Sequence, residues 1–301
     1  MNYPSSLSTR GGVIDFPAYV PVTTFGDRYP LDDLIRPYLR RLAPAMMISF
    51  HYAKQMKEKP SLPLMIDSGG FASLFSGSKV IKRAGLGIIE KKTENGIERI
   101  EALEVLDFQE QVADIAFTLD FPIPPDMERC EATKRLDLTI ANAHWALKNR
   151  RRKDMPLYAC VQAWDVESAR SCAEAYAGSS FEGIAIGGLV PRARNRKLVL
   201  SIVDAVREVV PDKPVHVFGL GKPDLVKELY EHGVQSVDSS SYVKLAASGR
   251  LWTDPMARYA ELTQTDRLNL AICNLAAATG KTLPLSTWPF VFQTMATKVV
   301  N

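Results

Sequence analysis

The sequence predicts a closed (β/α)8 barrel, in which eight parallel strands are surrounded by helices. Three observations support this prediction: short, almost continuously apolar runs recur along the chain, stretches with helical spacing of apolar residues separate them, and the apolar runs number eight. Strands that are apolar throughout are typical of parallel sheets covered by helices, and eight such units close into a barrel. A doubly wound open sheet is the alternative, but the GxGxxG fingerprint expected after its first strand is missing.

Each predicted strand is a short run of β-branched, aromatic and other apolar residues. The eight predicted strands are 18–24, 45–50, 62–66, 115–119, 157–161, 183–186, 215–218 and 234–237. Amphipathic stretches such as PLDDLIRPYLRRL and KPDLVKELYEHG lie between them, and their apolar residues recur every three to four positions. That period predicts helices that cover the sheet.

Two regions depart from the strand–helix repeat. Residues 76–104 are too many for a simple loop, and the turn sequence ENG within them predicts a small hairpin inserted after the third strand. Residues 254–301 contain two helix-like segments, 255–280 and the tail beyond Trp288, which we expect to pack on the barrel. The predicted division is therefore a catalytic barrel over 1–253 and a helical C-terminal extension over 254–301.

The composition is that of a soluble globular protein, with 46% hydrophobic and 24% charged residues among 301. A net charge of +3 requires no nucleic-acid partner, although basic residues cluster at 36–41, 148–153 and 192–197. Such runs are usually solvated surface, but three of them on one chain shift the balance toward binding a phosphate backbone.

The cysteines and the N-terminus indicate the compartment. Four scattered cysteines without a CxxC pair indicate a reducing environment and argue against a disulfide framework or a cysteine-rich zinc site. The chain begins without an apolar signal core, and no stretch approaches the ~18 apolar residues of a membrane span. We therefore expect a cytoplasmic protein, of a cell or of a phage-infected host, with no membrane contact.

Polar residues stand where predicted strands end. Asp67, Asp120 and Asp238 follow three of the strands, and Gln162 follows a fourth. The carboxyl ends of barrel strands share one mouth, where the chemistry of such folds takes place, so we expect these side chains to converge. A single Asp here is more often the N-cap of the next helix, and a carboxylate cluster can also bind Mg²⁺ or Ca²⁺. The residues alone do not decide between a metal site and a reacting group.

Glycine pairs follow two of the same strands, at Gly69-Gly70 and Gly187-Gly188. Glycine allows positive φ or the close approach of a flat ligand to the backbone. A tight turn explains either pair equally well.

Seven segments occur in the order found in one enzyme family. They are GGVIDFPAYVPVTT, DSGGF, LDFPIPP, CVQ, AIGGL, VFGLGKPDLV and VDSSSY…SGRLWT. Each is weak alone, but together they resemble the tRNA-guanine transglycosylases over roughly residues 11–253. Members of that family are (β/α)8 barrels that exchange a guanine in a nucleic acid for a 7-deazaguanine without breaking the sugar–phosphate backbone.

The resemblance implies two catalytic carboxylates. Asp238 matches the nucleophile that attacks the anomeric carbon and holds the nucleic acid covalently, a role that suits a carboxylate facing an oxocarbenium-like transition state. Asp67 matches the general acid/base that manages the proton of the departing and arriving base.

The resemblance also implies a base-binding site. Asp120 and Gln162 match positions that read the hydrogen-bonding edge of the purine, and Gly188 matches a backbone contact to its carbonyl. Phe71 and Phe218 match positions that enclose the flat heterocycle, although packing in the core explains either Phe equally well. The residues expected to bind the base are Ser68, Phe71, Asp120, Gln162, Gly187, Gly188 and Phe218.

The segment DSSSYVKLAASGRLWT departs from the bacterial tRNA enzymes, which follow the nucleophile with a Cys and a Pro-Thr-Arg run. It is more similar to the archaeal branch and to the DpdA-type enzymes that modify DNA, both of which use 7-cyano-7-deazaguanine. Ala72 also replaces a usual Gln. Because Cys273 is the only cysteine after the last predicted strand, the zinc site of the tRNA enzymes cannot be assembled. The archaeal enzymes' C-terminal RNA-binding domains have no counterpart before Asn301.

These departures favour a DNA-guanine transglycosylase that flips its target base out of the stack, with helper proteins that open DNA as candidate partners. The alternatives are a minimal tRNA enzyme, a non-catalytic partner subunit, and a sugar-phosphate or metal-dependent barrel enzyme. The presence of both Asp67 and Asp238 argues against the inactive subunit. We predict no metal and no cofactor. The basic residues expected to contact nucleic acid are Arg192, Arg194, Arg196, Lys197, Lys244 and Arg250.

Overall fold

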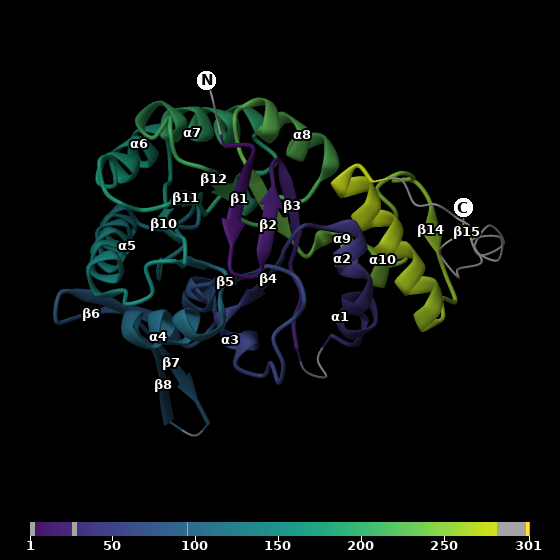
Figure 1. Ribbon diagram of the computed structural model, residues 1–301, viewed down its shortest axis with the longest axis horizontal. Helices are drawn as coiled ribbons and strands as arrows, with labels where there is room; N and C mark the ends of the chain where they lie inside the picture. Colours follow the sequence, from purple (N-terminus) through teal and green to yellow (C-terminus); the bar gives the residue numbers. More distant parts are fainter. Residues whose placement is uncertain (1–3, 26–28, 95, 282–298, 301) are drawn as a thin grey trace.

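Eight parallel strands form the centre of the computed structural model, which describes residues 4–25, 29–94, 96–281 and 299–300 (Figure 1). They are β3 (Ala18–Pro21), β4 (Met46–Ser49), β5 (Leu64–Asp67), β9 (Ile115–Phe117), β10 (Leu157–Val161), β11 (Gly183–Ile186), β12 (Val215–Val217) and β13 (Ser236–Ser239).

The order of the strands around the sheet is β3-β13-β12-β11-β10-β9-β5-β4. A parallel bridge between Val22 and Met47 joins the β3 end of this order to the β4 end. The Thr23 amide also donates to the Met47 carbonyl at 3.0 Å. The sheet therefore closes on itself, and the predicted (β/α)8 barrel is confirmed.

Helices cover the outer face of this sheet (Figure 1). They are α1 (Pro30–Ile35), α2 (Leu39–Leu42), α3 (Phe50–Ala53), α4 (Ala102–Val112), α5 (Arg129–Asn149), α6 (Val166–Glu174), α7 (Arg196–Val209), α8 (Pro223–Glu231) and α9 (Ser241–Ala247), with short 3-10 segments η1 (Arg36–Tyr38), η2 (Gly70–Leu74) and η3 (Val190–Arg192). In α7 the Asn195 side chain caps the first turn by accepting from the Leu198 amide, and Val199, Ile202 and Val206 are buried. This spacing turns one apolar stripe toward the barrel.

Side chains fill the interior of the barrel. Val20, Met47, Phe117 and Tyr158 belong to one buried cluster that lies inside the strands. An antiparallel hairpin of β1 (Ser6–Thr9) and β2 (Gly12–Asp15), which the sequence does not predict as a separate element, precedes β3 and adds the fully buried Ile14 to this cluster. The hairpin therefore closes the amino end of the barrel, and the carboxyl end is left as the mouth.

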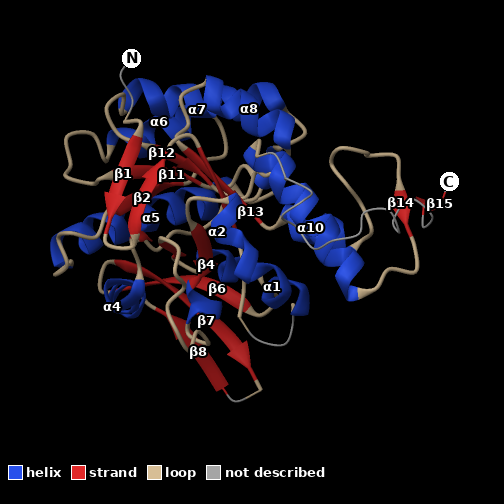
Figure 2. Cartoon of the chain, turned by 45° about the vertical axis from the view of Figure 1, so that its right-hand side comes forward, coloured by secondary structure: helices blue, strands red, loops and turns tan. Residues whose placement is uncertain are grey.

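The insertion predicted after the third strand is present. It contains three antiparallel strands rather than a single hairpin: β6 (Ser78–Arg83), β7 (Leu86–Thr93) and β8 (Gly96–Ile100). Residue 95 of the predicted ENG turn lies outside the described residues. Figures 1 and 2 show β7 and β8 projecting from the barrel beside α4.

The chain after the barrel is partly helical. α10 (Gln264–Thr279) begins with Thr263 and Asp266 capping each other and packs against α9 and α1. The predicted helix is wrong before residue 263, where β14 (Arg258–Tyr259) pairs with β15 (Val299–Val300), and the two strands lie beyond α10 in Figure 2. Most of the tail beyond Trp288 lies outside the described residues. The division at residue 253 stays a prediction.

No helix in the part of the chain that the structure describes has both the length and the apolar character needed to cross a bilayer.

Asn142 of α5 ties the insertion to the barrel. Its amide nitrogen donates to the carbonyls of Gly87 and Leu119, both at 3.2 Å, and its oxygen accepts from the Gly87 amide at 2.9 Å. We expect Asn142→Ala to lower the free energy of unfolding by about 2–4 kcal/mol, because it leaves buried backbone groups without partners. Urea unfolding of this variant and of Asn149→Ala measures the effect.

Asn149→Ala is the matched control. Asn149 is exposed on the same helix, and its amide contacts only the Trp145 carbonyl of the preceding turn. Equal losses in the two variants would show that Asn142 contributes no more than an exposed side chain.

Candidate active site

The mouth of the barrel collects the polar residues predicted at the strand ends. Asp67 ends β5, Asp238 is the residue before the last one of β13, Asp120 follows β9 and Gln162 follows β10. Because all these strands are parallel, their carboxyl ends meet at one rim. Asp120, Gln162 and Asp238 are buried, and Asp67 is partly exposed.

Asp238 has one oxygen held by two donors. Its Oδ1 contacts His216 Nε2 at 3.0 Å and accepts from the Gly219 amide at 3.1 Å. Its other oxygen, Oδ2, accepts no hydrogen bond from any residue that the structure describes. The carboxylate is thus fixed through one oxygen, and its second oxygen is available to react.

Asp67 lies close to two other carboxyl groups. Its Oδ1 accepts from the Gly69 amide at 2.8 Å and from the Phe50 amide at 3.3 Å. Burial raises the pKa of Asp67 to about 7, and the charges of Asp238 and Asp120 add to the rise, while the Gly69 amide and the Ser49 hydroxyl oppose it. A carboxyl group with this pKa can both donate and accept a proton near neutral pH.

Asp120 is the centre of a hydrogen-bonded group. The Ser68 hydroxyl donates to its Oδ1 at 2.6 Å, and the Gln162 amide donates to its Oδ2 at 2.5 Å. Burial raises the pKa of Asp120, and these two donors oppose the rise. Gly70 is required beside it, because a Cβ at this position would overlap the Asp120 carbonyl oxygen.

The second glycine pair lies against Gln162. A Cβ on Gly187 would overlap the Gln162 amide nitrogen, and one on Gly188 would lie 2.9 Å from its Oε1. Gly188 also has φ +73°, which favours glycine. The buried Oε1 of Gln162 accepts no hydrogen bond from the described residues. A ligand that donates at this point would satisfy it.

The two glycine amides are used differently. The Gly187 amide donates to the Val161 carbonyl at 2.9 Å, whereas the Gly188 amide has no acceptor among the residues described. The expected backbone contact to a base is therefore open to Gly188 and closed to Gly187.

The two predicted aromatic residues differ in exposure. Phe71 in η2 is 64% exposed and meets Phe75 edge to face at a centroid distance of 5.6 Å. Phe218 follows β12, is partly buried, and lies 5.0 Å from the Phe117 ring inside the barrel. Both stand at the mouth, and their enclosure of a base stays a prediction.

The predicted basic residues differ in exposure and in their partners. Arg192 is buried and donates to the carbonyls of Gly188 at 2.6 Å and Ile123 at 3.0 Å, so it holds the glycine turn. Two carbonyls inside the protein use its Nη1, and the expected contact of Arg192 to nucleic acid stays a prediction. Arg196 pairs with Glu228 of α8. Arg194 and Lys197 are exposed.

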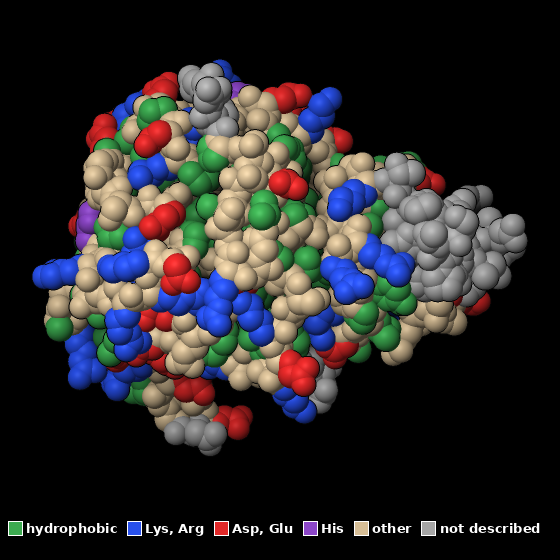
Figure 3. All heavy atoms as spheres, in the orientation of Figure 1, with side chains coloured by type: hydrophobic (Ala, Val, Ile, Leu, Met, Phe, Trp, Pro, Cys, Tyr) green, Lys and Arg blue, Asp and Glu red, His purple; other side chains and the backbone are tan. Residues whose placement is uncertain are grey.

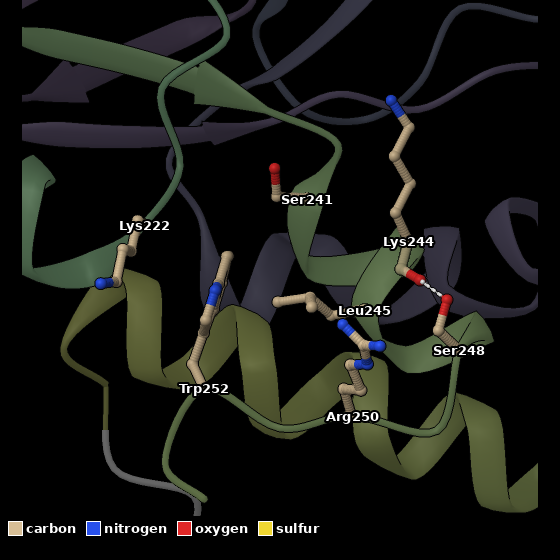
Figure 4. Close-up of a pocket in the computed structure, with 7 residues that line it drawn as sticks. All are labelled: Lys222, Ser241, Lys244, Leu245, Ser248, Arg250 and Trp252. Atoms are coloured by element: carbon tan, nitrogen blue, oxygen red, sulfur yellow. Dashed lines mark hydrogen bonds between the residues drawn. The ribbon is translucent and has the colours of Figure 1, made fainter. Parts of the chain in front are cut away.

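Lys244 and Arg250 border a pocket of about 390 Å³ beside β13 (Figure 4). Neither forms an ion pair with the described part of the chain. Figure 3 shows Lys and Arg side chains gathered over the region where Figure 1 places α1, α2 and α9. The residues that line the pocket are Lys222, Ser241, Lys244, Leu245, Ser248, Arg250 and Trp252.

His216 is the site residue that sequence reasoning missed. It lies in the middle of β12, and its ring is fully buried beside Asp238. The one signal was a histidine at an inward position of the apolar run VHVF, in register with Ser236 on the neighbouring strand.

Within the described residues, no three side chains of His, Cys, Asp or Glu form a cluster that could hold a metal ion.

Comparison with known families matches residues 5–281 to the family described as queuine tRNA-ribosyltransferase (TGT). The chain belongs to this family. The match extends over the barrel, the insertion and α10, so it agrees with the resemblance seen in the motifs. The carboxylates at the mouth are therefore interpreted as those of a member of this family.

Curated relatives carry the name tRNA-guanine(15) transglycosylase. That of Thermococcus kodakarensis is 28% identical over 260 residues, which cover 82% of this chain and 42% of the relative. That of Pyrococcus furiosus is 28% identical over 281 residues, with 89% and 45% covered, and that of Methanococcus vannielii is 32% identical over 166 residues, with 53% and 26% covered. This chain spans less than half the length of each of these relatives.

The raised pKa of Asp67 predicts a pH-dependent stability. The pKa rises from 3.8 to about 7 on folding, so the folded state holds more protons than the unfolded state between these values. The contribution of Asp67 to stability therefore falls as the pH rises through this window. We expect the wild type to lose on the order of 2 kcal/mol relative to Asp67→Asn between about pH 4 and pH 8 in urea unfolding.

Asp137→Asn serves as the control for this measurement, because Asp137 is exposed on α5. The explanation fails if Asp67→Asn and Asp137→Asn change the pH dependence equally.

Proposed function

We propose that the chain exchanges guanine in a nucleic acid for a 7-deazaguanine base through a covalent intermediate on Asp238. The observation that carries this proposal is the pair of unlike carboxyl groups at one mouth. Asp238 offers a free Oδ2 while its Oδ1 is held, and burial brings the pKa of Asp67 to about 7. Membership of the family supports the same chemistry.

In the first half of the reaction, Asp238 Oδ2 forms a bond to the anomeric carbon as the bond from that carbon to guanine breaks. The bonding electron pair stays on the guanine, which takes up the proton that Asp67 carries in its neutral form. The sugar–phosphate chain is then attached to the protein as an ester.

In the second half, the incoming base gives a proton to the Asp67 carboxylate and forms the new bond to the anomeric carbon. The ester bond breaks with its electrons, which restores the Asp238 carboxylate. Both residues return to their starting states, so no further reactant is required.

Recognition of the base is assigned to the group around Asp120. The unpartnered Gln162 Oε1 can accept from a purine N–H, and the Gly188 amide can donate to a carbonyl oxygen. Asp120 is held by Ser68 and Gln162 and can accept from a second N–H. The open face of Phe71 suits stacking against the heterocycle.

The names of the relatives favour tRNA as the nucleic acid. DNA, which the motifs first suggested, is kept as the second candidate on one observation: between Asp238 and residue 301 the sequence has a single cysteine, Cys273, and no histidine. The zinc site that the resemblance associates with tRNA enzymes therefore has too few ligands in this segment. A cyano-substituted 7-deazaguanine is the proposed incoming base in either case.

Labelled guanine tests the reaction and its acceptor together. We expect label to enter tRNA when the protein is incubated with labelled guanine, and a protein–nucleic acid adduct to survive denaturation. Label found only in duplex DNA would identify DNA, and not tRNA, as the nucleic acid that is modified. Label in neither would contradict base exchange and favour a non-catalytic subunit.

Asp238→Asn is the control for this experiment. It keeps the size and the hydrogen bonds of the side chain but removes the nucleophilic carboxylate, so we expect the exchange rate to fall by at least about 10³-fold and the adduct to disappear. Exchange at the wild-type rate in this variant would exclude Asp238 as the nucleophile.

Lys244 and Arg250 are proposed to neutralise phosphates of the bound nucleic acid. If so, Lys244→Gln and Arg250→Gln each reduce the slope of log affinity against log salt by about one and weaken binding alike for all sequences. Binding titrations at several salt concentrations measure this.

Lys57→Gln is the matched control, because Lys57 is exposed in the loop before β5, at the amino end of the barrel. An equal change in its slope would show that the effect is one of overall charge.

A further inference from the structure

A buried imidazole links the carboxylate of Asp238 to a serine hydroxyl. His216 Nε2 lies 3.0 Å from Asp238 Oδ1, and His216 Nδ1 lies 2.8 Å from Ser236 Oγ. His216 and Ser236 are register partners on β12 and β13, and the His216 ring is fully buried. Both ring nitrogens are therefore used inside the protein.

The chemistry of the two contacts fixes the tautomer of the ring. An ionised carboxylate can only accept, so Nε2 must carry the hydrogen that points at Asp238. In the neutral imidazole Nδ1 then carries none, and it accepts from the Ser236 hydroxyl. Ser236 thus satisfies Nδ1 in the tautomer that donates to Asp238.

Packing fixes the orientation of the ring. The Phe117 ring lies 5.2 Å from the imidazole and the Phe218 ring lies 5.0 Å from it, centroid to centroid. Both rings pack against the imidazole, and a turn of the imidazole about its axis would break both of its hydrogen bonds. The Nε2–H bond therefore has a fixed direction relative to the barrel.

We propose that His216 is a positioning residue for the nucleophile. By donating to Oδ1 together with the Gly219 amide, it turns Oδ2 of Asp238 toward the mouth and the anomeric carbon. Its hydrogen bond strengthens when the ester breaks and the negative charge returns to the carboxylate, so it also assists release of the nucleic acid. Ser236 acts through His216. This inference rests on the proposed base exchange.

Four variants test the inference through the split between kcat and KM. His216→Phe keeps a flat ring but removes the donor, and we expect kcat to fall about 100-fold because the carboxylate loses its orientation. The KM for the incoming base stays within about twofold, since Asp120 and Gln162 bind it. His216→Gln retains an N–H donor and recovers about tenfold of the loss.

Ser236→Ala lowers kcat by roughly threefold in the wild type and has no further effect in His216→Phe, because Ser236 acts only through the ring. Tyr158→Phe, a buried change in the same barrel interior that leaves the Asp238 contacts intact, keeps the wild-type kcat.

The tautomer is measured on the unaltered protein. In ¹⁵N-labelled protein, which contains four histidines, His216 is expected to show a protonated Nε2 and an unprotonated Nδ1. This measurement does not depend on activity or on the folding of a variant.

Three results would each overturn the inference: a wild-type kcat in His216→Phe, a full additional loss from Ser236→Ala in that background, or a proton on Nδ1 instead of Nε2. If the wild type exchanges no base while the Nε2–H tautomer is found, the proposed function fails and the hydrogen bond to Asp238 stands.

Discussion

The register of the parallel strands decides which side chains reach the mouth. Along a strand, alternate residues face opposite sides, so a slip of one residue exchanges the two sets. In β13 the present register turns Ser236 and Asp238 inward and Val237 toward the surrounding helices. A slip would bury Asp238 against apolar helices and place a valine at the mouth. The outward position of Val237 in this register therefore places Asp238, the proposed nucleophile, at the mouth.

The three carboxyl groups at the mouth, of which Asp120 and Asp238 are buried and Asp67 is partly exposed, repel one another when all are ionised, and each has a different set of hydrogen-bond donors. Asp120 has two side-chain donors, Asp238 has two donors on a single oxygen, and Asp67 relies mainly on the Gly69 amide. At Asp67 the loss of solvation outweighs the hydrogen bonds that the carboxylate accepts, and it raises the pKa of this group. Unequal hydrogen bonding thus turns three identical functional groups into a base reader, a nucleophile and a proton carrier in the mechanism we propose.

The strands and the carboxylates could be predicted because they depend on local pattern. Apolar runs mark strands, and Asp67, Asp120 and Asp238 stand directly after three of the runs predicted from the sequence. What escaped prediction depends on partners distant in sequence. His216 resembles a core residue until its register with Ser236 is known, and Arg192 resembles a surface charge until its carbonyl partners are seen. The third strand of the insertion and the hairpin before β3 were missed because short polar strands carry a weak pattern.

The hairpin of β1 and β2 bears on the order in which bases enter and leave the site in the proposed reaction. Because Ile14 is buried among the interior side chains, the amino end of the barrel is closed, and the site opens only at the carboxyl end. In the mechanism we propose, the departing base and its replacement must then use the same opening in turn. In that mechanism the incoming base enters only after guanine has left, and the ester to Asp238 holds the nucleic acid in the meantime.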